Sequence, residues 1–403
     1  MPYAIGLNSG SSFDGIDAVV IQIEQDAEGQ LTPPKFVTGL SHDWPQEVKD
    51  LVLRAFANEL SLFDMTRLNY TVGAIFAEVA QAVLEQAKLK PADVSVIGYD
   101  GQTVYQEPPE QDSMKRVGPG EHWYRRWTVG GYPCGMQIGE PGVVATLVDI
   151  PVVSQFRSVD HALGGTGAPL MQFLDYIVFR GVGPTVTLNI GGISNLQLAL
   201  ADRSKMMAFD CGPGNVMIDH AMMRLYSRAY DTDGEVAAKG SVVPELLTGL
   251  MNHPFFKRPV PRCAWRLDFG ADYADTILHK YRMLSSEDLV ATITRFSAEA
   301  IISSYLEFVV PKQDVTQIVV SGGGVRNATL MRLITEMLPS GVALVLSDEY
   351  GMPTQFKEAI KFATLASATL ISNANNIPAA CGAARFGVLG KLVQAPRNVR
   401  LTT

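Results

Sequence analysis

The stretch that decides the fold is YAIGLNSGSSFDGIDAVVIQI, residues 3–23. Its two ends, 3–7 and 16–23, are rich in β-branched and apolar residues and predict two strands of a hairpin. The turn between them, NSGSSFDG, is longer and richer in serine and glycine than closure of a hairpin requires. Backbone N–H groups in such a turn can surround phosphate oxygens without interfering side chains. An ordinary polar hairpin turn is the alternative interpretation.

Several side chains of this turn could contribute to such a site. Ser11 and Ser12 offer hydroxyl donors, and Asp14 offers a carboxylate that could hold Mg²⁺ or a sugar hydroxyl. Gly10 and Gly15 leave the backbone accessible to a ligand. The turn is therefore a candidate phosphate site.

The same pattern returns near the middle of the chain. A strand is predicted over 185–190, followed by the turn GGISN and a second strand over 196–200. Two hairpins with small-residue turns suggest an ancient duplication. A third turn, Gly322-Gly323-Gly324, separates a strand at 317–320 from a helix beginning near Asn327, where a nucleotide can lie against the backbone.

Two carboxylates stand near predicted helix starts. Asp210, in FDCGPGN, ends a short predicted strand before a helix that begins near Pro213. A general base in sugar phosphorylation needs a carboxylate in such a place, although a helix-capping aspartate is the simpler interpretation of this motif alone. Glu358 lies near the start of a helix opened by FKEAIKFA, where it could simply favour the helix dipole. His161 is expected to be a solvated or core histidine.

The order of elements indicates an α/β protein with two lobes. Helices are predicted over 46–88, 287–310 and 357–373, and a loop over 106–135. The expected domains are residues 1–180 and 181–403, with a return of the final helix to the first lobe left open. This division agrees with the length of 403 residues.

Composition excludes several classes of protein. The net charge is −8, from 33 basic and 41 acidic residues, so a basic footprint for nucleic acid is not expected. The start MPYAIGLNSG has no signal-peptide pattern, and the chain lacks an apolar run long enough for a membrane span. The four cysteines fit neither a zinc nor a disulfide pattern. We expect reduced thiols, a cytoplasmic location and no membrane partner.

Together the motifs resemble the anhydro-N-acetylmuramic acid kinase family, which includes levoglucosan kinase. The resemblance runs from about residue 4 to about residue 390 and rests on GLNSGSSFDGID, GYDGQTVYQEP, QIGEPGVVA, QFRSVDHALGGTGAPL, LNIGGISNL, FDCGPGN, YDTDGEVAAKG, VVSGGGVRN and KEAIKFA. It implies the two-lobed α/β ATPase fold of actin, heat-shock protein 70 and hexokinase, with an active-site cleft between the lobes. It also implies that ATP and Mg²⁺ bind there.

Carried over by motif, the resemblance implies roles for particular residues. Asp210 matches the catalytic base, Asp14 and Arg157 match substrate contacts, and Glu358 matches a position linked to the metal, which Asp14 could share. Asn195 and Arg266 are further candidate sugar contacts. Phosphate and adenosine contacts are expected from Gly10, Ser11, Ser12, Gly15, Gly191, Gly192, Gly212, Gly214, Asn215, Gly322, Gly323, Gly324 and Asn327.

The chain departs from the family pattern on the side of the substrate. Asp100 stands where the family usually has histidine before Gly-Gln-Thr, and Ala264-Trp265-Arg266-Leu267 stands where it usually has Thr-Gly-Arg-Glu. The segment 111–133 is longer than expected. These differences bear on which sugar is bound.

The resulting hypothesis is an ATP-dependent 1,6-anhydrosugar kinase of carbohydrate or amino-sugar metabolism. Asp210 would take a proton from water that attacks the anomeric carbon, and the opened oxygen on C6 would attack the γ-phosphate, giving a sugar 6-phosphate. A plain anhydrohexose such as levoglucosan is favoured over the muramic acid derivative because Trp265 could fill the room that the larger sugar needs. A conventional hydroxyl kinase and a non-catalytic nucleotide-binding relative are the alternatives, and a homodimer is left open.

Overall fold

A computed structural model describes residues 3–10, 13, 15–107, 109, 122–128, 131–264 and 266–396, without the side chains of 266 and 267. The chain divides into a first unit, Met1–Val178 with Phe356–Thr403, and a second unit, Phe179–Gln355. The first boundary lies close to the expected residue 180. The single C-terminal domain 181–403 is a wrong expectation, because the segment from Phe356 onward packs with the first unit.

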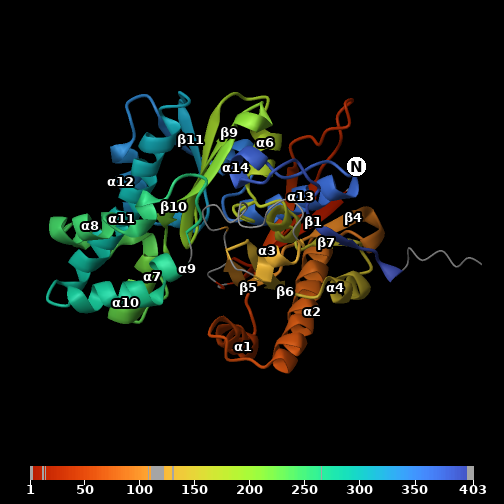
Figure 1. Ribbon diagram of the computed structural model, residues 1–403, viewed down its shortest axis with the longest axis horizontal. Helices are drawn as coiled ribbons and strands as arrows, with labels where there is room; N and C mark the ends of the chain where they lie inside the picture. Colours follow the sequence, from red (N-terminus) through yellow and green to blue (C-terminus); the bar gives the residue numbers. More distant parts are fainter. Residues whose placement is uncertain are drawn as a thin grey trace, which may run out of the picture. The chain divides into compact units, whose positions relative to one another are not determined.

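The first unit is built on a six-stranded sheet with the order β13-β7-β4-β1-β2-β3 (Figure 1). These strands are β1 Tyr3–Asn8, β2 Ile16–Gln22, β3 Lys35–His42, β4 Val94–Gly98, β7 Val152–Ser154 and β13 Lys391–Val393. β1 and β2 form the predicted antiparallel hairpin, β3 pairs antiparallel with β2, and β4 and β7 continue parallel to β1. A separate two-stranded sheet pairs β5 Gln102–Glu107 with β6 Cys134–Ile138.

The second unit repeats this topology. Its sheet has the order β10-β9-β8-β11-β12, with β8 Thr185–Ile190, β9 Ile193–Ala199, β10 Met207–Pro213, β11 Gln317–Ser321 and β12 Ala343–Leu346. In each unit the first three principal strands form an antiparallel meander, and the fourth and fifth run parallel to the first. This repeat confirms the predicted α/β class and the prediction that a hairpin opens each unit.

Helices cover the sheets of both units. In the first unit they are α1 Gln46–Phe56, α2 Leu62–Gln86, α3 Arg125–Thr128, α4 Pro141–Val148, α5 Arg157–Ala162, α6 Gln172–Phe179, α13 Lys357–Leu370 and α14 Pro378–Cys381, with the last residue of α6 already in the second unit. In the second unit they are α7 Val216–Tyr226, α8 Pro244–Met251, α9 Arg266–Phe269, α10 Ala271–Lys280, α11 Ser286–Ser304 and α12 Ala328–Met337. No helix in the described ranges has the length and apolar character of a membrane span.

The helix predictions hold with small changes. The stretch 46–88 is two helices, and Ser61 caps the second of them through a bond from the N–H of Asp64. The stretch 287–310 is α11 continued by a π-helical turn, Tyr305–Val309. The predicted loop 106–135 contains α3 among its described residues and ends at β6.

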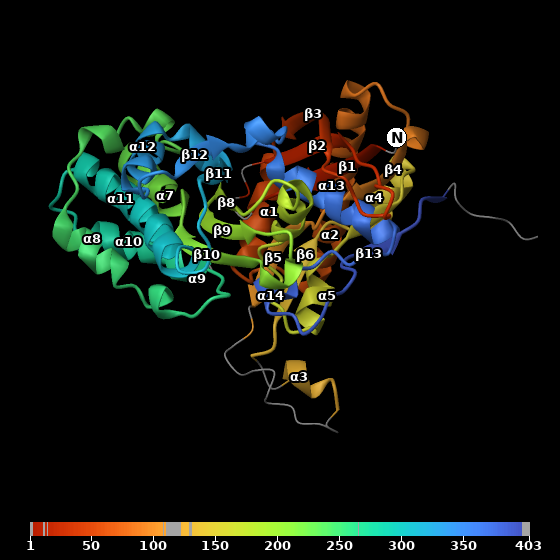
Figure 2. The ribbon, with the colours of Figure 1, turned by 90° about the horizontal axis from the view of Figure 1, so that it is seen from above.

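Helix α13 lies directly on the backbone of β1 and β4 (Figures 1 and 2). Gly6 and Gly98 are register partners on these neighbouring strands. A Cβ atom built on Gly6 would lie 1.9 Å from the carbonyl oxygen of Ala359, and one on Gly98 would lie 2.1 Å from that of Phe362. Two glycines therefore allow α13 to approach the sheet, and this contact explains why the segment belongs to the first unit.

A methyl group at either glycine should force α13 away from the sheet. We expect Gly98→Ala to lower the free energy of unfolding by about 1–3 kcal/mol, the usual cost of overpacking a core. The matched control is Gly181→Ala, since a Cβ there meets nothing within 4 Å. Urea unfolding of both variants measures the difference, and equal stabilities would contradict the close-approach interpretation.

Candidate active site

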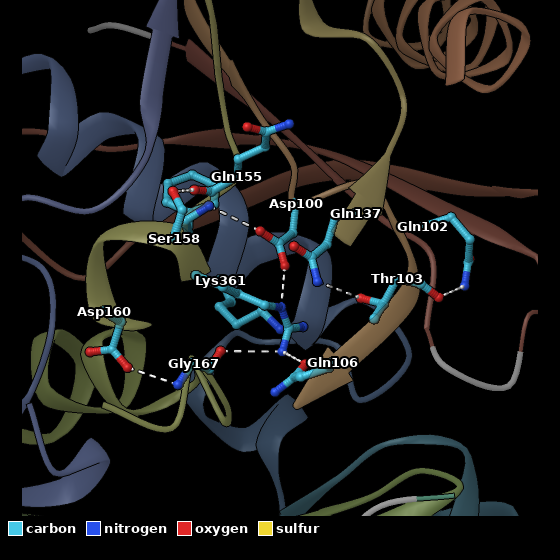
Figure 3. A network of polar contacts seen from close by, with 12 residues as sticks. Asp100, Gln102, Thr103, Gln106, Gln137, Gln155, Ser158, Asp160, Gly167 and Lys361 are labelled. Carbon is cyan, nitrogen blue, oxygen red and sulfur yellow. Dashed lines mark hydrogen bonds and ion pairs between the residues drawn. The ribbon is translucent and has the colours of Figure 1, made fainter. Parts of the chain in front are cut away.

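A network of polar contacts in the first unit includes Asp100, Gln106 and Gly167 (Figure 3). Its centre is the ion pair between buried Asp100 and partly buried Arg157. Asp100 follows β4 and is 4% exposed. One carboxylate oxygen accepts from the N–H of Phe156 at 3.0 Å, and the other forms a short ion pair with Nε of Arg157. Arg157 is the first residue of α5, so the end of β4 and the start of this helix are held together by charge.

The rest of the Arg157 guanidinium is held by β5 and by the loop after α5. Nη1 donates to Oε1 of Gln106 at 2.7 Å and to the carbonyl of Gly167 at 3.2 Å. The Gly167 N–H in turn donates to Asp160 at 2.8 Å. Arg157 was predicted to contact substrate, and Nη2 has no hydrogen-bond partner among the described residues. The predicted role of Arg157 in substrate binding stays a prediction.

Helix α13 brings a second set of charges to the first unit. Its first residue, Lys357, forms a fully buried ion pair with Asp175 of α6 at 2.9 Å. Glu358 follows it with its side chain 32% exposed, and Lys361 stands one turn further along, 3.9 Å from Glu358 Oε2. Figure 3 shows Lys361 near Asp100. The structure therefore places the predicted metal-linked Glu358 on the same helix as a buried lysine.

The first glycine turn is described only in part. Ser11, Ser12 and Asp14 lie outside the described residues, so their predicted roles stay predictions. Phe13 is described, has a φ of 56° and packs on Trp44 with ring centroids 4.9 Å apart. Its N–H donates to the carbonyl of Gly10, which closes the turn.

The turn is also tied to the DGQT segment. Ser9 Oγ donates to Oε1 of Gln102 at 2.6 Å and accepts from the indole N–H of Trp44 at 3.2 Å. Gln102 opens β5, the strand that also carries Gln106. The candidate phosphate turn and the Arg157 network are therefore parts of one framework.

In the second unit, Asp210 is held in place from two directions. It lies in β10, is 8% exposed, and its Oδ2 accepts from the N–H of Ala264 at 2.7 Å. Its backbone N–H donates to the carbonyl of Arg262 at 2.9 Å, and Nε of Arg262 donates back to the Asp210 carbonyl at 3.1 Å. Arg262 is itself buried, and burial lowers its pKa. These bonds fix the orientation of the Asp210 carboxylate.

Asp210 does not cap a helix, and its strand does not end there. β10 continues to Pro213 through a bulge between Asp210 and Gly212, where Gly212 has a φ of 138°. Helix α7 begins only at Val216, so the helix start predicted near Pro213 is three residues early. The bulge explains the difference, because it keeps the glycine-rich segment in the sheet before the chain turns.

Asp210 belongs to a polar row that crosses four strands. It is the register partner of Asn195, which pairs with Asn189, which pairs with Ser321. Ser321 Oγ donates to Asn189 at 3.3 Å. The alternate residues of these strands join the apolar cluster with α11 and α12, so the sheet has one apolar and one polar face. This row brings the predicted Asp210 and Asn195 together.

The second and third glycine turns lie at adjacent strand ends. They follow β8 and β11, which pair in parallel, and a Cβ built on Gly322 would lie 2.6 Å from the carbonyl oxygen of Ile190. The N–H groups of Gly214 and Asn215 donate to the carbonyls of Gly192 and Gly191 at 2.8 and 2.9 Å. These two predicted phosphate donors therefore serve the packing of the turn in this structure.

Other predicted positions have clear local roles. Asn327 caps α12 by accepting from the N–H of Leu330 at 2.9 Å. The side chain of Arg266 and the whole of Trp265 lie outside the described residues. Asp268 pairs with Arg258 at 2.5 Å. Sequence reasoning missed Arg262 as a support for Asp210, because nothing in the local pattern marks its contact with a strand fifty residues earlier.

A comparison with protein families gives one decisive match. The family model described as "AnmK: Anhydro-N-acetylmuramic acid kinase" matches residues 2–395. The chain belongs to the anhydro-N-acetylmuramic acid kinase family. It is accordingly a carbohydrate kinase, a transferase.

Individual relatives of this family are similar over almost the entire chain. The anhydro-N-acetylmuramic acid kinase of Bacillus cereus strain AH187 is 34% identical over 395 residues, which cover 97% of this chain and 98% of that protein. The enzyme of the same name from Clostridioides difficile strain 630 is 33% identical over 398 residues, which cover 98% of this chain and 99% of that protein.

A comparison with solved structures gives a more distant similarity. Component A of Acidaminococcus fermentans (R)-2-hydroxyglutaryl-CoA dehydratase aligns over 91% of this chain and 98% of its own, with a TM-score of 0.40 and 15% identity.

One histidine of this family member lies in the core beside the Arg157 network. His161 is 4% exposed, as one of the two expected environments predicts, and its Nε2 has no hydrogen-bond partner in the described structure. Burial, and then the charge of Arg157, lowers its pKa from 6.5 to about 4. The folded protein therefore binds this proton less readily than the unfolded chain.

The free energy of unfolding should fall as the pH drops from the unfolded pKa of His161, about 6.5, toward its folded pKa of about 4. Since the folded pKa is depressed, stability is complete above about 6.5 and is lost toward pH 4, by about 2 kcal/mol between pH 7.5 and 5.0. Urea unfolding at both pH values measures this slope, with His161→Gln as the comparison. Asp160, whose pKa burial raises, remains in both proteins. Equal slopes in the two proteins would refute the assignment to His161.

Proposed function

We propose that the protein is an ATP-dependent kinase of 1,6-anhydrosugars that opens the anhydro bridge with water and phosphorylates O6. The observation that carries this proposal is the fixed, nearly buried carboxylate of Asp210. Its orientation by the N–H of Ala264 and by Arg262 is what a general base requires. Membership in a carbohydrate kinase family supports the reaction class.

The proposed reaction uses one base and transfers one phosphoryl group. Asp210 takes a proton from water, whose oxygen bonds to the anomeric carbon while the bond from that carbon to the bridge oxygen breaks. The bridge oxygen, now attached only to C6, bonds to the γ-phosphorus, and ADP leaves. The proton taken by Asp210 is released afterwards, and the products are a sugar 6-phosphate and ADP.

ATP would lie against the two glycine turns that follow β8 and β11 in the second unit. Gly322, Gly323 and Gly324 follow β11, and nothing lies within 4 Å of a Cβ built on Gly323. Such open backbone suits the close approach of a nucleotide. Within the described ranges no cluster of three or more acidic, histidine or cysteine side chains could hold a metal. Glu358, whose side chain is partly exposed on α13, is the carboxylate that would hold Mg²⁺, and the ion would neutralise charge on the nucleotide phosphates.

The charge around Arg157 favours an uncharged sugar. The guanidinium is already neutralised by Asp100, and Gln106 and Gly167 take both N–H bonds of Nη1. What remains at Nη2 suits a hydroxyl or ether oxygen better than a carboxylate, which would also meet the negative charge of Asp100. We therefore propose a plain anhydrohexose such as levoglucosan as the preferred substrate. The muramic acid derivative named by the relatives carries a lactyl carboxylate and is the alternative.

Removal of the base should abolish turnover. We expect Asp210→Asn to lower kcat by a factor of about 10² or more while the dissociation constant of ATP changes little. Initial rates with levoglucosan and calorimetric ATP titration measure the two effects. In H₂¹⁸O the wild-type product should carry the label at C1. Unlabelled product would favour a conventional hydroxyl kinase, and near-normal turnover of the variant would exclude Asp210 as the base.

Removal of the Asp100 charge should shift selectivity toward carboxylate-bearing sugars. For Asp100→Asn we expect the ratio of kcat/KM for 1,6-anhydro-N-acetylmuramic acid to that for levoglucosan to rise about tenfold or more, because Arg157 is left uncompensated. Because both kcat/KM values are measured on the same enzyme preparation, their ratio does not depend on the fraction of the enzyme that is active. The control Asp231→Asn removes another buried carboxylate, which accepts from the N–H groups of Val236 and Ala237. An unchanged ratio at Asp100→Asn would reject this explanation.

A further inference from the structure

Among the described residues of the first unit, two lysines are buried, Lys357 and Lys361, and Arg157 is partly buried. Arg157 is paired with Asp100, and Lys357 is paired with Asp175 at 2.9 Å. The third, Lys361 of α13, is 7% exposed. Its nearest carboxylate oxygen belongs to Glu358 and is 3.9 Å from Nζ, beyond hydrogen-bond distance.

The ammonium group of Lys361 therefore keeps its donors available. Among the described residues Nζ has no hydrogen-bond acceptor, and its other close contact is the ring of Phe362, 4.2 Å from the centroid. A lysine buried without hydrogen bonds is costly, because the protein does not replace the water that its charge has lost. Burial accordingly lowers the pKa of Lys361, while the charge of Glu358 opposes the shift. A structural role would have been filled more cheaply by an apolar side chain.

We infer that Lys361 binds the phosphoryl group that this kinase transfers, donating hydrogen bonds to its oxygens. The inference rests on the proposed function, and it assigns a role to a residue outside the predicted catalytic, sugar, phosphate and metal positions. An ammonium group is a compact charge with three donors and is a common phosphate ligand. A neutral hydroxyl would restore much less of the lost hydration than a phosphoryl oxyanion does.

Its position on α13 supports this choice of ligand. Glu358, the expected metal-linked residue, lies one helical turn before Lys361. Figure 3 shows Asp100 near Lys361, and the charges of Asp100 and Arg157 both act on Lys361. In a chain of net charge −8, an arriving polyphosphate needs local cations, and Arg157 is already neutralised. Lys361 keeps its proton throughout, since the phosphoryl group moves between two oxygens and Lys361 only stabilises its charge.

The test compares Lys361→Met, which keeps the chain length without the charge, with Lys361→Arg, which keeps the charge. We expect Lys361→Met to lower kcat about 10²-fold, the usual cost of losing one preorganised donor to a transferred group. Its free energy of unfolding should be unchanged or higher, because a buried charge without hydrogen bonds is removed. Lys361→Arg should retain more activity than Lys361→Met. The exposed Lys312→Met serves as the control and should match wild type.

A binding measurement separates this inference from the proposed function. By calorimetry without sugar, wild type should bind the non-hydrolysable ATP analogue AMP-PNP about tenfold or more tightly than ADP, and Lys361→Met should lose that preference. If wild type phosphorylates no anhydrosugar, the proposed function fails while this comparison still tests Lys361. A kcat for Lys361→Met within threefold of wild type, or an unchanged preference for AMP-PNP, would overturn the inference.

Discussion

The close contact of α13 with the bare backbone of β1 and β4 is the constraint on which the first unit depends. A pair of glycines in register, Gly6 and Gly98, lets helix carbonyls lie where Cβ atoms would otherwise be. The contact joins α13 to β4, although the two are some 260 residues apart in sequence. It explains why the segment from Phe356 onward packs with the first unit rather than with the second. Because the helix cannot slide on a surface this tight, the side chains of its first two turns acquire fixed positions. Lys361 is thereby held where the charge of Asp100, which follows β4, acts on it.

The two units use one sheet topology for two kinds of polar surface. In the first, charges dominate: Lys357 and Asp175 form a buried pair, and Arg157 and Asp100 form a partly buried one. In the second, neutral amides and hydroxyls cross the sheet in register and lead to a single carboxylate, Asp210. Neutral side chains beside Asp210 do not compete for its charge, whereas paired ions fix each other's geometry but cost desolvation. The difference agrees with the proposed role of Asp210 as the base.

Local sequence patterns predicted the parts of this structure that depend on local chemistry. Hairpins, glycine turns and long helices follow from residue spacing, and the α/β repeat followed from their order. Whether α13 returns to the first unit could not be predicted, because a glycine in a strand does not indicate which helix packs against it. The bulge after Asp210 displaced the predicted start of α7, because bulges are set by pairing with β9 rather than by the bulged residues alone. Arg262 and Lys361 were missed for a similar reason: their importance lies in contacts and burial, which no spacing rule reveals.

The Asp100–Arg157 pair shows why an identical motif position can have a different meaning in a different charge environment. An arginine at the start of α5 would attract a carboxylate if it stood alone, but here Asp100 neutralises it within a buried setting where charges are weakly screened. The same carboxylate also accepts from the N–H of Phe156, so it is fixed by the backbone and cannot turn away when a ligand arrives. Gln106 and the Gly167 carbonyl hold the other side of the guanidinium. If Arg157 contacts the sugar as proposed, its neighbours would govern selectivity as much as Arg157 itself.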